Sequence, residues 1–147
     1  MLKSSILHPE ILAALARGGH SSKVLIADGN YPFATRIGRN ARLVFLNLAP
    51  GKVLVTDVLE ALLATVSIEA AEVMQPARSG PYAMAGDPPI FAEFSGLLKA
   101  AAPDVTLVPL ERFAFYESAA TNDVCLTVAT GEQRIYANLL LTIGVVR

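Results

Sequence analysis

Short apolar runs alternate with segments of helical periodicity along this chain, and no other feature constrains its fold as strongly. The run at residues 23–27 is continuous and ends at Asp28, which predicts a buried, parallel strand. A helix is predicted before it, opened by Pro9 and ended by Gly18 and Gly19. This alternation predicts an α/β domain with a mainly parallel or mixed central sheet. Further strands are predicted at 43–46, 68–74, 105–108, 123–129 and 136–145, and further helices after Thr56 and at 90–101 and 111–120.

The chain of 147 residues has the length of one domain, and residues 1–147 contain no internal repeat or linker. Its hydrophobic content of 53% exceeds the roughly 45–50% that is usual for globular domains. A chain of this composition can bury a large core and still have apolar surface left over. We therefore expect a single domain that associates into an oligomer.

Charge and cysteine content argue against several classes of protein. The 12 basic and 13 acidic residues leave a net charge of −1, which gives no electrostatic footprint for nucleic acid or for an anionic membrane. The single cysteine, Cys125, cannot form an internal disulfide. No stretch approaches the roughly 20 apolar residues of a membrane span, and the first residues do not resemble a signal peptide. The cytoplasm is the expected location.

Metal and cofactor chemistry find little support in the sequence. A zinc site needs three or four Cys, His or carboxylate ligands, and the two histidines, His8 and His20, are not at helical spacing. There is no phosphate-binding loop of the Walker type, no dinucleotide fingerprint and no serine in a nucleophile elbow. Cys125 has no flanking positive group, so we predict that it is a small residue of the core. We expect neither a cofactor nor a metal.

His20 is the candidate acid–base group. It follows the helix stop in a short loop, and histidine is the side chain best suited to proton transfer near neutral pH. The alternative is a structural or merely exposed histidine. Asp28 ends the first strand, at the kind of sheet edge where α/β proteins bind ligands. The alternative for Asp28 is an Asx turn with Gly29 and Asn30.

Polar residues in the second half of the chain are further candidates. Arg112 begins a helix directly after a strand, which suits contact with a ligand oxygen, although a surface arginine is an equal alternative. Tyr136 and Asn138 are two apart on a predicted strand, so both side chains would point to one face. Such a pair of neutral hydrogen-bonding groups suits an uncharged polyol. The Pro- and Gly-rich segment at 75–89 reads as a long loop, and such loops are often functional.

Taken together, these segments resemble the ribose pyranase / L-fucose mutarotase family (RbsD/FucU-like) over most of the chain. Residues 112–116 are more similar to the fucose branch, since the ribose branch tends to have a histidine near position 112. The loop at 75–89 departs from both branches and leaves the substrate open. The segments that carry the resemblance are 7–10, 19–20, 26–28, 55–59, 112–117, 130–132 and 136–141.

The resemblance implies an RbsD-like fold, which is a single three-layer α/β/α domain. It also implies that His20 is the catalytic proton donor, that a free monosaccharide is the substrate and that no cofactor takes part. Tyr116 would have at most a supporting role, and a helix aromatic at the core edge is its favoured alternative. The sugar contacts that the resemblance implies are Asp28, Arg112, Tyr136 and Asn138, with backbone help near Ala137.

Mutarotation opens the ring hemiacetal of a sugar and closes it again on the other face or onto another hydroxyl. Opening needs one proton delivered to the ring oxygen and one removed from the anomeric hydroxyl. We expect His20 to deliver the first, and the base could be Asp28, Tyr136 or water. One positioned acid–base group typically accelerates such a step by about 10²–10⁴-fold, which is enough for a reaction that already runs in water.

The predicted positions of His20 and Asp28 bear on assembly. A strand of five residues is about 17 Å long, and these two residues lie beyond its opposite ends. One subunit would therefore not bring both to one small sugar, and a neighbouring subunit would complete the site. The resemblance implies the same, because members of the family form ring-based homo-oligomers, typically decamers.

Two other hypotheses remain open at this point. One is a non-catalytic sugar-binding or regulatory protein with the same pocket, in which sugar binding would survive the loss of His20. The other is a different cofactor-free enzyme, such as a sugar isomerase or a lyase that uses His20, which would form a chemically new product.

Overall fold

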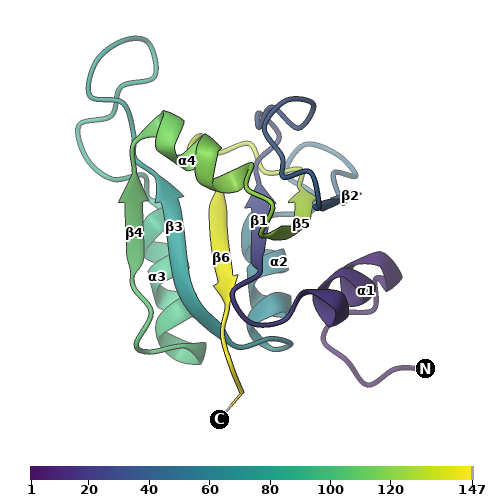
Figure 1. The fold of residues 1–147 in the computed structure, drawn as a ribbon. Coiled ribbons are helices and arrows are strands. Elements are labelled where there is room, and N and C mark those ends of the chain that lie inside the picture. The colour runs from purple at the N-terminus through teal and green to yellow at the C-terminus, as the bar shows by residue number, and fades with distance from the viewer. Residues whose placement is uncertain (147) are drawn as a thin grey trace.

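The computed structural model describes residues 1–146, which form a six-stranded sheet and four helices (Figure 1). The strands lie side by side in the order β2-β5-β1-β6-β3-β4. Their bounds are Lys23–Ala27 (β1), Arg42–Phe45 (β2), Ile68–Met74 (β3), Leu107–Leu110 (β4), Val124–Ala129 (β5) and Leu139–Ile143 (β6). The helices are Pro9–Gly18 (α1), Val55–Leu63 (α2), Ile90–Ala101 (α3) and Arg112–Ala119 (α4).

Strand β6 is the exception in direction. β1 pairs in parallel with β5, β5 with β2, and β3 with β4. β6 lies between β1 and β3 and is antiparallel to both. The other five strands therefore share one direction. We call the edge where they end the carboxyl edge and the edge where they begin the amino edge, so β6 starts at the carboxyl edge. This mixed, mainly parallel sheet confirms the prediction.

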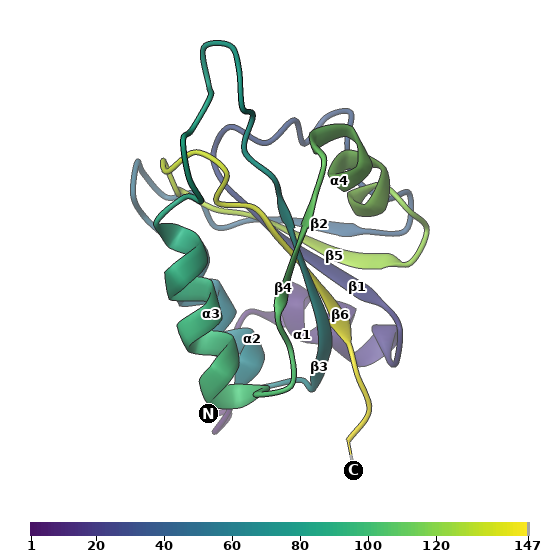
Figure 2. The same ribbon diagram turned by 90° about the vertical axis from the view of Figure 1, so that its left-hand side faces the viewer.

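Helices cover both faces of the sheet unequally, as Figure 2 shows. α1, α2 and α3 pack on one face, where the larger core contains Ile11, Leu59 and Phe94. α4 alone packs on the other face, over a smaller core that contains Leu25 and Phe115. The three-layer α/β/α architecture is therefore confirmed.

The continuous apolar run of β1 follows from its position between these two cores. Val24 and Ile26 contact the larger core, whereas Leu25 and Ala27 contact the smaller one, and none of the four is exposed to solvent. A strand that is buried on both faces has no polar side to present, so its sequence does not alternate. The prediction of a buried strand at 23–27 is correct to the residue.

The strands expected at 43–46 and 123–129 are off by one residue, and two others have boundaries that are wrong by two residues or more. The strand expected at 105–108 lies two residues later as β4, and Pro109 is tolerated there because β4 is an edge strand. The strand expected at 136–145 is shorter, as β6, because Tyr136 has a left-handed φ of 63° that a strand does not accommodate. Tyr136 and Asn138 thus precede the strand, and the argument from a shared strand face is wrong.

Helix starts follow backbone chemistry. Pro9 is the first residue of α1, as predicted, where its missing N–H costs nothing. The helix expected after Thr56 begins slightly earlier, at Val55, and the Asp57 carboxylate accepts a hydrogen bond of 2.8 Å from the N–H of Leu54. Within residues 1–146, none of the helices has both the length and the apolar character that crossing a membrane requires.

Candidate functional site

A cavity of about 310 Å³ opens at the carboxyl edge of the sheet. Asp28 reaches it from the end of β1 and Arg112 from the start of α4, directly after β4. Tyr136 and Asn138 reach it from the segment that leads into β6. Because β6 is antiparallel, its beginning lies beside the ends of β1 and β3, which brings residues more than 100 positions apart to one site.

Asp28 is the most deeply buried charged group of this cavity, with 2% of its surface exposed. Its two carboxylate oxygens accept hydrogen bonds of 2.9 Å, one from the N–H of Asn30 and one from the side-chain amide of Asn138. Desolvation by burial raises the pKa of Asp28 to about 6, and the hydrogen bonds from Asn30, Asn138 and the backbone of Ala137 only partly offset it. This carboxyl group can therefore exchange a proton near neutral pH.

Asn138 fixes the orientation of Asp28. Its side-chain oxygen accepts a hydrogen bond of 2.9 Å from the N–H of Asp28 while its amide nitrogen donates to the carboxylate. Asn138 is 5% exposed, so it joins β1 to the segment before β6 inside the protein. Ala137 is fully buried and does not line the cavity, so a backbone contact between Ala137 and a sugar stays a prediction.

Arg112 and Tyr116 form one wall of the cavity from adjacent turns of α4. The Arg112 guanidinium carbon lies 5.8 Å from the centroid of the Tyr116 ring, within the range of a cation–π contact. The ring of Tyr31 meets that of Tyr116 edge-on at 5.7 Å. The side chain of Glu111 caps α4 by accepting from the N–H of Phe113 at 2.8 Å. Tyr116 thus lines the cavity and also packs against the smaller core, as the core-edge interpretation expected.

An ion pair between buried Glu132 and partly exposed Arg134 holds the segment between β5 and β6. One terminal guanidinium nitrogen of Arg134 is 2.8 Å from the Glu132 carboxylate, and the other is 2.8 Å from the carboxylate of Glu93 on α3. Burial opposes the charge on Glu132, but hydrogen bonds from Arg134 and Gln133 lower its pKa overall. The backbone oxygen of Glu132 accepts from the N–H of Gly29 at 2.8 Å. This segment therefore fixes the turn that follows Asp28.

Five cavity residues were not singled out as sugar contacts from the sequence. Tyr31 follows the Gly29-Asn30 turn, and a functional reading of that turn would have found it. Met74 ends β3 and could have been found by the rule that ligands bind at the ends of parallel strands. Tyr82 in the loop 75–89 and Ile135 in the segment before β6 give no such signal in the sequence. The five residues are Asn30, Tyr31, Met74, Tyr82 and Ile135.

His20 lies away from this cavity. It precedes β1, at the amino edge, whereas Asp28 follows β1 at the carboxyl edge. Its side chain is 55% exposed, and its Nε2 atom is 3.1 Å from a carboxylate oxygen of Glu69 on β3. Within one chain, the structure therefore brings together Asp28, Arg112, Tyr136 and Asn138 but not His20.

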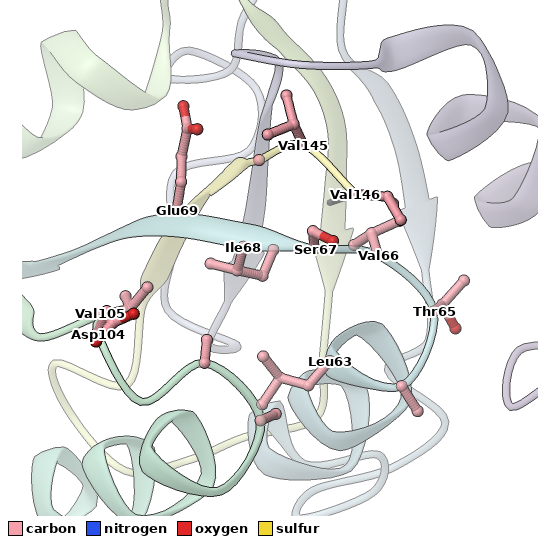
Figure 3. Close-up of a pocket in the computed structure, with 14 residues that line it drawn as sticks. Leu63, Thr65, Val66, Ser67, Ile68, Glu69, Asp104, Val105, Val145 and Val146 are labelled. Atoms are coloured by element: carbon pink, nitrogen blue, oxygen red, sulfur yellow. The ribbon is translucent and has the colours of Figure 1, made fainter.

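A larger cavity of about 610 Å³ lies at the amino edge (Figure 3). Its walls are mostly aliphatic side chains, such as Leu63, Ile68 and Val145, and Glu69 and Asp104 are its charged residues. It holds no buried titratable group. Within residues 1–146, no three His, Cys, Asp or Glu side chains are grouped so that they could hold a metal ion. The chemistry of the smaller cavity makes it the better candidate site.

Comparisons with known proteins point to one family. The profile of the RbsD / FucU transport protein family matches residues 1–146. The chain is 34% identical to the fucose mutarotase of Danio rerio, over 97% of this chain and 91% of that protein. It is 33% identical to the D-ribose pyranase of Streptomyces coelicolor, over 99% and 98%. The fold is similar to that of the Streptococcus pneumoniae fucose mutarotase in complex with L-fucose, with a TM-score of 0.79 and 24% identity over 100% of both chains.

Proposed function

Because the chain belongs to the RbsD / FucU family, we propose that it is a cofactor-independent mutarotase of a free monosaccharide. The observation that carries this proposal is the cavity that holds Asp28, Arg112 and Asn138, three groups that hydrogen bond well to sugar hydroxyls. Relatives named fucose mutarotase and D-ribose pyranase make a fucose-like sugar the first candidate substrate and ribose the second. The cavity volume of about 310 Å³ suits one sugar ring.

Asp28 is the base in this proposal. Ring opening requires removal of the proton from the anomeric hydroxyl, and a carboxylate whose pKa is about 6 is ionised at neutral pH yet basic enough to share that proton. Both of its oxygens already accept one hydrogen bond, which fixes their direction. Arg112 and Asn138 would hold neighbouring hydroxyls of the sugar.

His20 of a second copy is the proposed proton donor. The 55% exposure of the His20 side chain at the amino edge supports this, because a neighbouring molecule can reach the ring there. The chain also exposes large apolar side chains that a neighbour could cover, namely Phe45, Leu48, Val108 and Phe113. A ring-based homo-oligomer, with a decamer as the form that the resemblance implies, would repeat this contact around the ring. The cytoplasmic location stays a prediction that cell fractionation would test.

NMR exchange spectroscopy tests the proposal on a panel of free sugars, which includes fucose, ribose, galactose and rhamnose. Wild type is expected to speed the exchange between anomers or ring forms of at least one sugar, and His20→Ala is expected not to. The sugar with the largest acceleration identifies the substrate. If no sugar exchanges faster with the protein than in buffer, the proposed mutarotase activity is excluded.

A non-catalytic sugar-binding or regulatory protein is the second candidate, and the distance of His20 from the cavity favours it. In that case the cavity binds a sugar, no exchange appears, and His20→Ala binds as tightly as wild type. Ligand-observed NMR in the same samples measures that binding. A chemically new product would instead indicate a different isomerase or a lyase.

A further inference from the structure

The hydroxyl group of Tyr136 is already occupied by protein groups. It accepts a hydrogen bond of 3.0 Å from the N–H of Ala77 and donates one of 2.9 Å to the backbone oxygen of Tyr82. A phenol has a single proton to donate, and here that proton is used within the protein. One lone pair at most remains for a ligand, so the hydroxyl is a poor partner for a sugar.

Both bonds go to the same loop, which closes on itself. The N–H of Met84 donates to the oxygen of Ala77 at 3.0 Å, so the two arms of the segment 77–84 lie side by side. Gly80, with a φ of 88°, allows the turn between them. Tyr136 contacts one arm at Ala77 and the other at Tyr82. The loop projects beyond the carboxyl edge of the sheet and is drawn in teal beyond the ends of β3 and β4 in Figure 1.

Tyr82 is the aromatic residue of this loop, and it lines the cavity. Met74 and Ile135 also line the cavity, and 63% of Tyr82 is exposed. These apolar groups contrast with the polar lining by Asp28 and Asn138. A sugar likewise has a polar and an apolar part, because hydroxyl groups project from its ring edge and C–H groups cover parts of its faces. An aromatic ring packs well against such a C–H face while polar groups bind the hydroxyls.

We propose that the segment 77–84 is a lid over the cavity, that Tyr82 on this lid packs on the apolar face of the bound sugar, and that the Tyr136 hydroxyl holds the lid. Tyr82 then sets specificity: it favours a 6-deoxyhexopyranose, whose methyl group extends the apolar face, over a pentose. This inference rests on the proposed sugar chemistry of the cavity and deepens it.

The first test is the concentration dependence of sugar exchange, measured by NMR with L-fucose and with D-ribose. Tyr82→Ala is expected to raise KM for L-fucose about 3- to 10-fold, the range of one aromatic contact, with a smaller rise for D-ribose and little change in kcat. Tyr82→Phe should match wild type, because only the ring is used. An unchanged KM in Tyr82→Ala, or a large change in Tyr82→Phe, would overturn the role of Tyr82.

The second test separates the lid from a direct sugar contact of Tyr136. Tyr136→Phe removes both hydrogen bonds, so amide hydrogen exchange in 77–84 should speed up without any sugar present, and KM for L-fucose should rise. The double variant with Tyr82→Ala should be no worse than Tyr82→Ala alone, since both act through the same ring. Additive losses, or unchanged amide exchange, would overturn the proposal.

Failure of the proposed function has a different signature. If wild type neither speeds the exchange of any sugar nor binds one, the mutarotase and the sugar contact of Tyr82 are both excluded. If wild type is active and only the variant results disagree, the function stands and the lid inference is wrong.

Discussion

The two edges of the sheet each hold a cavity and a titratable group, and they differ in how these are combined. At the carboxyl edge, the cavity of about 310 Å³ is lined by Asp28, which is 2% exposed. At the amino edge, the cavity is about twice as large, but His20 and its partner Glu69 have side chains that are 55% and 41% exposed. Burial, more than volume, changes the chemistry of a side chain, because desolvation moves its pKa.

In the proposed mechanism, each edge holds only part of the acid–base site. The carboxyl edge has a carboxyl group with a raised pKa and the proposed sugar contacts, and the amino edge has the histidine. If one copy supplies Asp28 and a neighbouring copy supplies His20, both groups can meet one sugar without any conformational change within a chain. Four predictions would break or sharpen this division.

Replacement of Asp28 should have the largest effect. Asp28→Asn removes the base and places an amide against the amide of Asn138, so sugar exchange should slow by about 10²–10⁴-fold. Asp104→Asn is the matched control at the amino-edge cavity and should keep wild-type activity. NMR exchange rates measure both, with circular dichroism to verify folding. Full activity in Asp28→Asn would show that the reaction does not take place at the carboxyl edge.

Mixing two inactive variants tests whether the edges of different copies cooperate. If each site combines His20 of one copy with Asp28 of another, His20→Ala and Asp28→Asn co-refolded in equal amounts should recover up to about a quarter of wild-type activity, from sites with two intact contributors. Each variant alone should stay inactive. Sedimentation analysis gives the oligomeric state, and a fully active monomer would contradict the shared site.

Added side-chain volume should affect the two edges differently. A Cβ atom at Gly131, near the carboxyl edge, would lie 2.1 Å from the backbone oxygen of Lys52, so Gly131→Ala should destabilise the protein by about 3 kcal/mol or more. At Gly144, near the amino edge, the nearest atom would be the Glu69 Cβ at 3.1 Å, so Gly144→Ala should cost less. Urea unfolding measures both, and equal losses would mean that the edges are equally tightly packed.

The pH dependence of stability gives the smallest effect. The pKa of Asp28 is about 6 in the folded protein and 3.8 without burial, so the folded state holds the proton more tightly. Stability from this group is complete below the unfolded value and is lost as pH rises to about 6, by up to about 3 kcal/mol. The difference in urea stability between wild type and Asp28→Asn, measured from pH 4 to 7, isolates this change. A difference that does not vary with pH would mean that Asp28 is not desolvated.

The sequence predicts the strands and helices well where burial alone determines them. The run at 23–27 became β1 without a shift because both of its faces are buried. The separation of His20 from Asp28 could be predicted for the same reason, since a strand between two residues fixes their distance. The resemblance to the family is confirmed by the profile match and by the identity to curated relatives.

Long-range contacts explain what the sequence did not predict. The hydroxyl of Tyr136 binds residues more than 50 positions earlier, and no local pattern reveals such partners. The proposed role of Tyr82 and the raised pKa of Asp28 both depend on segments that meet only in the folded protein. The pairing of Tyr136 with Asn138 in one cavity was expected, but through a strand that begins only at Leu139.

The antiparallel insertion of β6 has a consequence for biosynthesis. β6 lies inside the sheet, between β1 and β3, yet it is the last of these six strands to leave the ribosome. Until residues 139–143 have emerged, the nascent chain has two half-sheets with unpaired central edges, a condition that favours aggregation. The same step brings Tyr136 and Asn138 to Asp28, so a nascent chain that stops before β6 has neither a continuous sheet nor the complete cavity at the carboxyl edge.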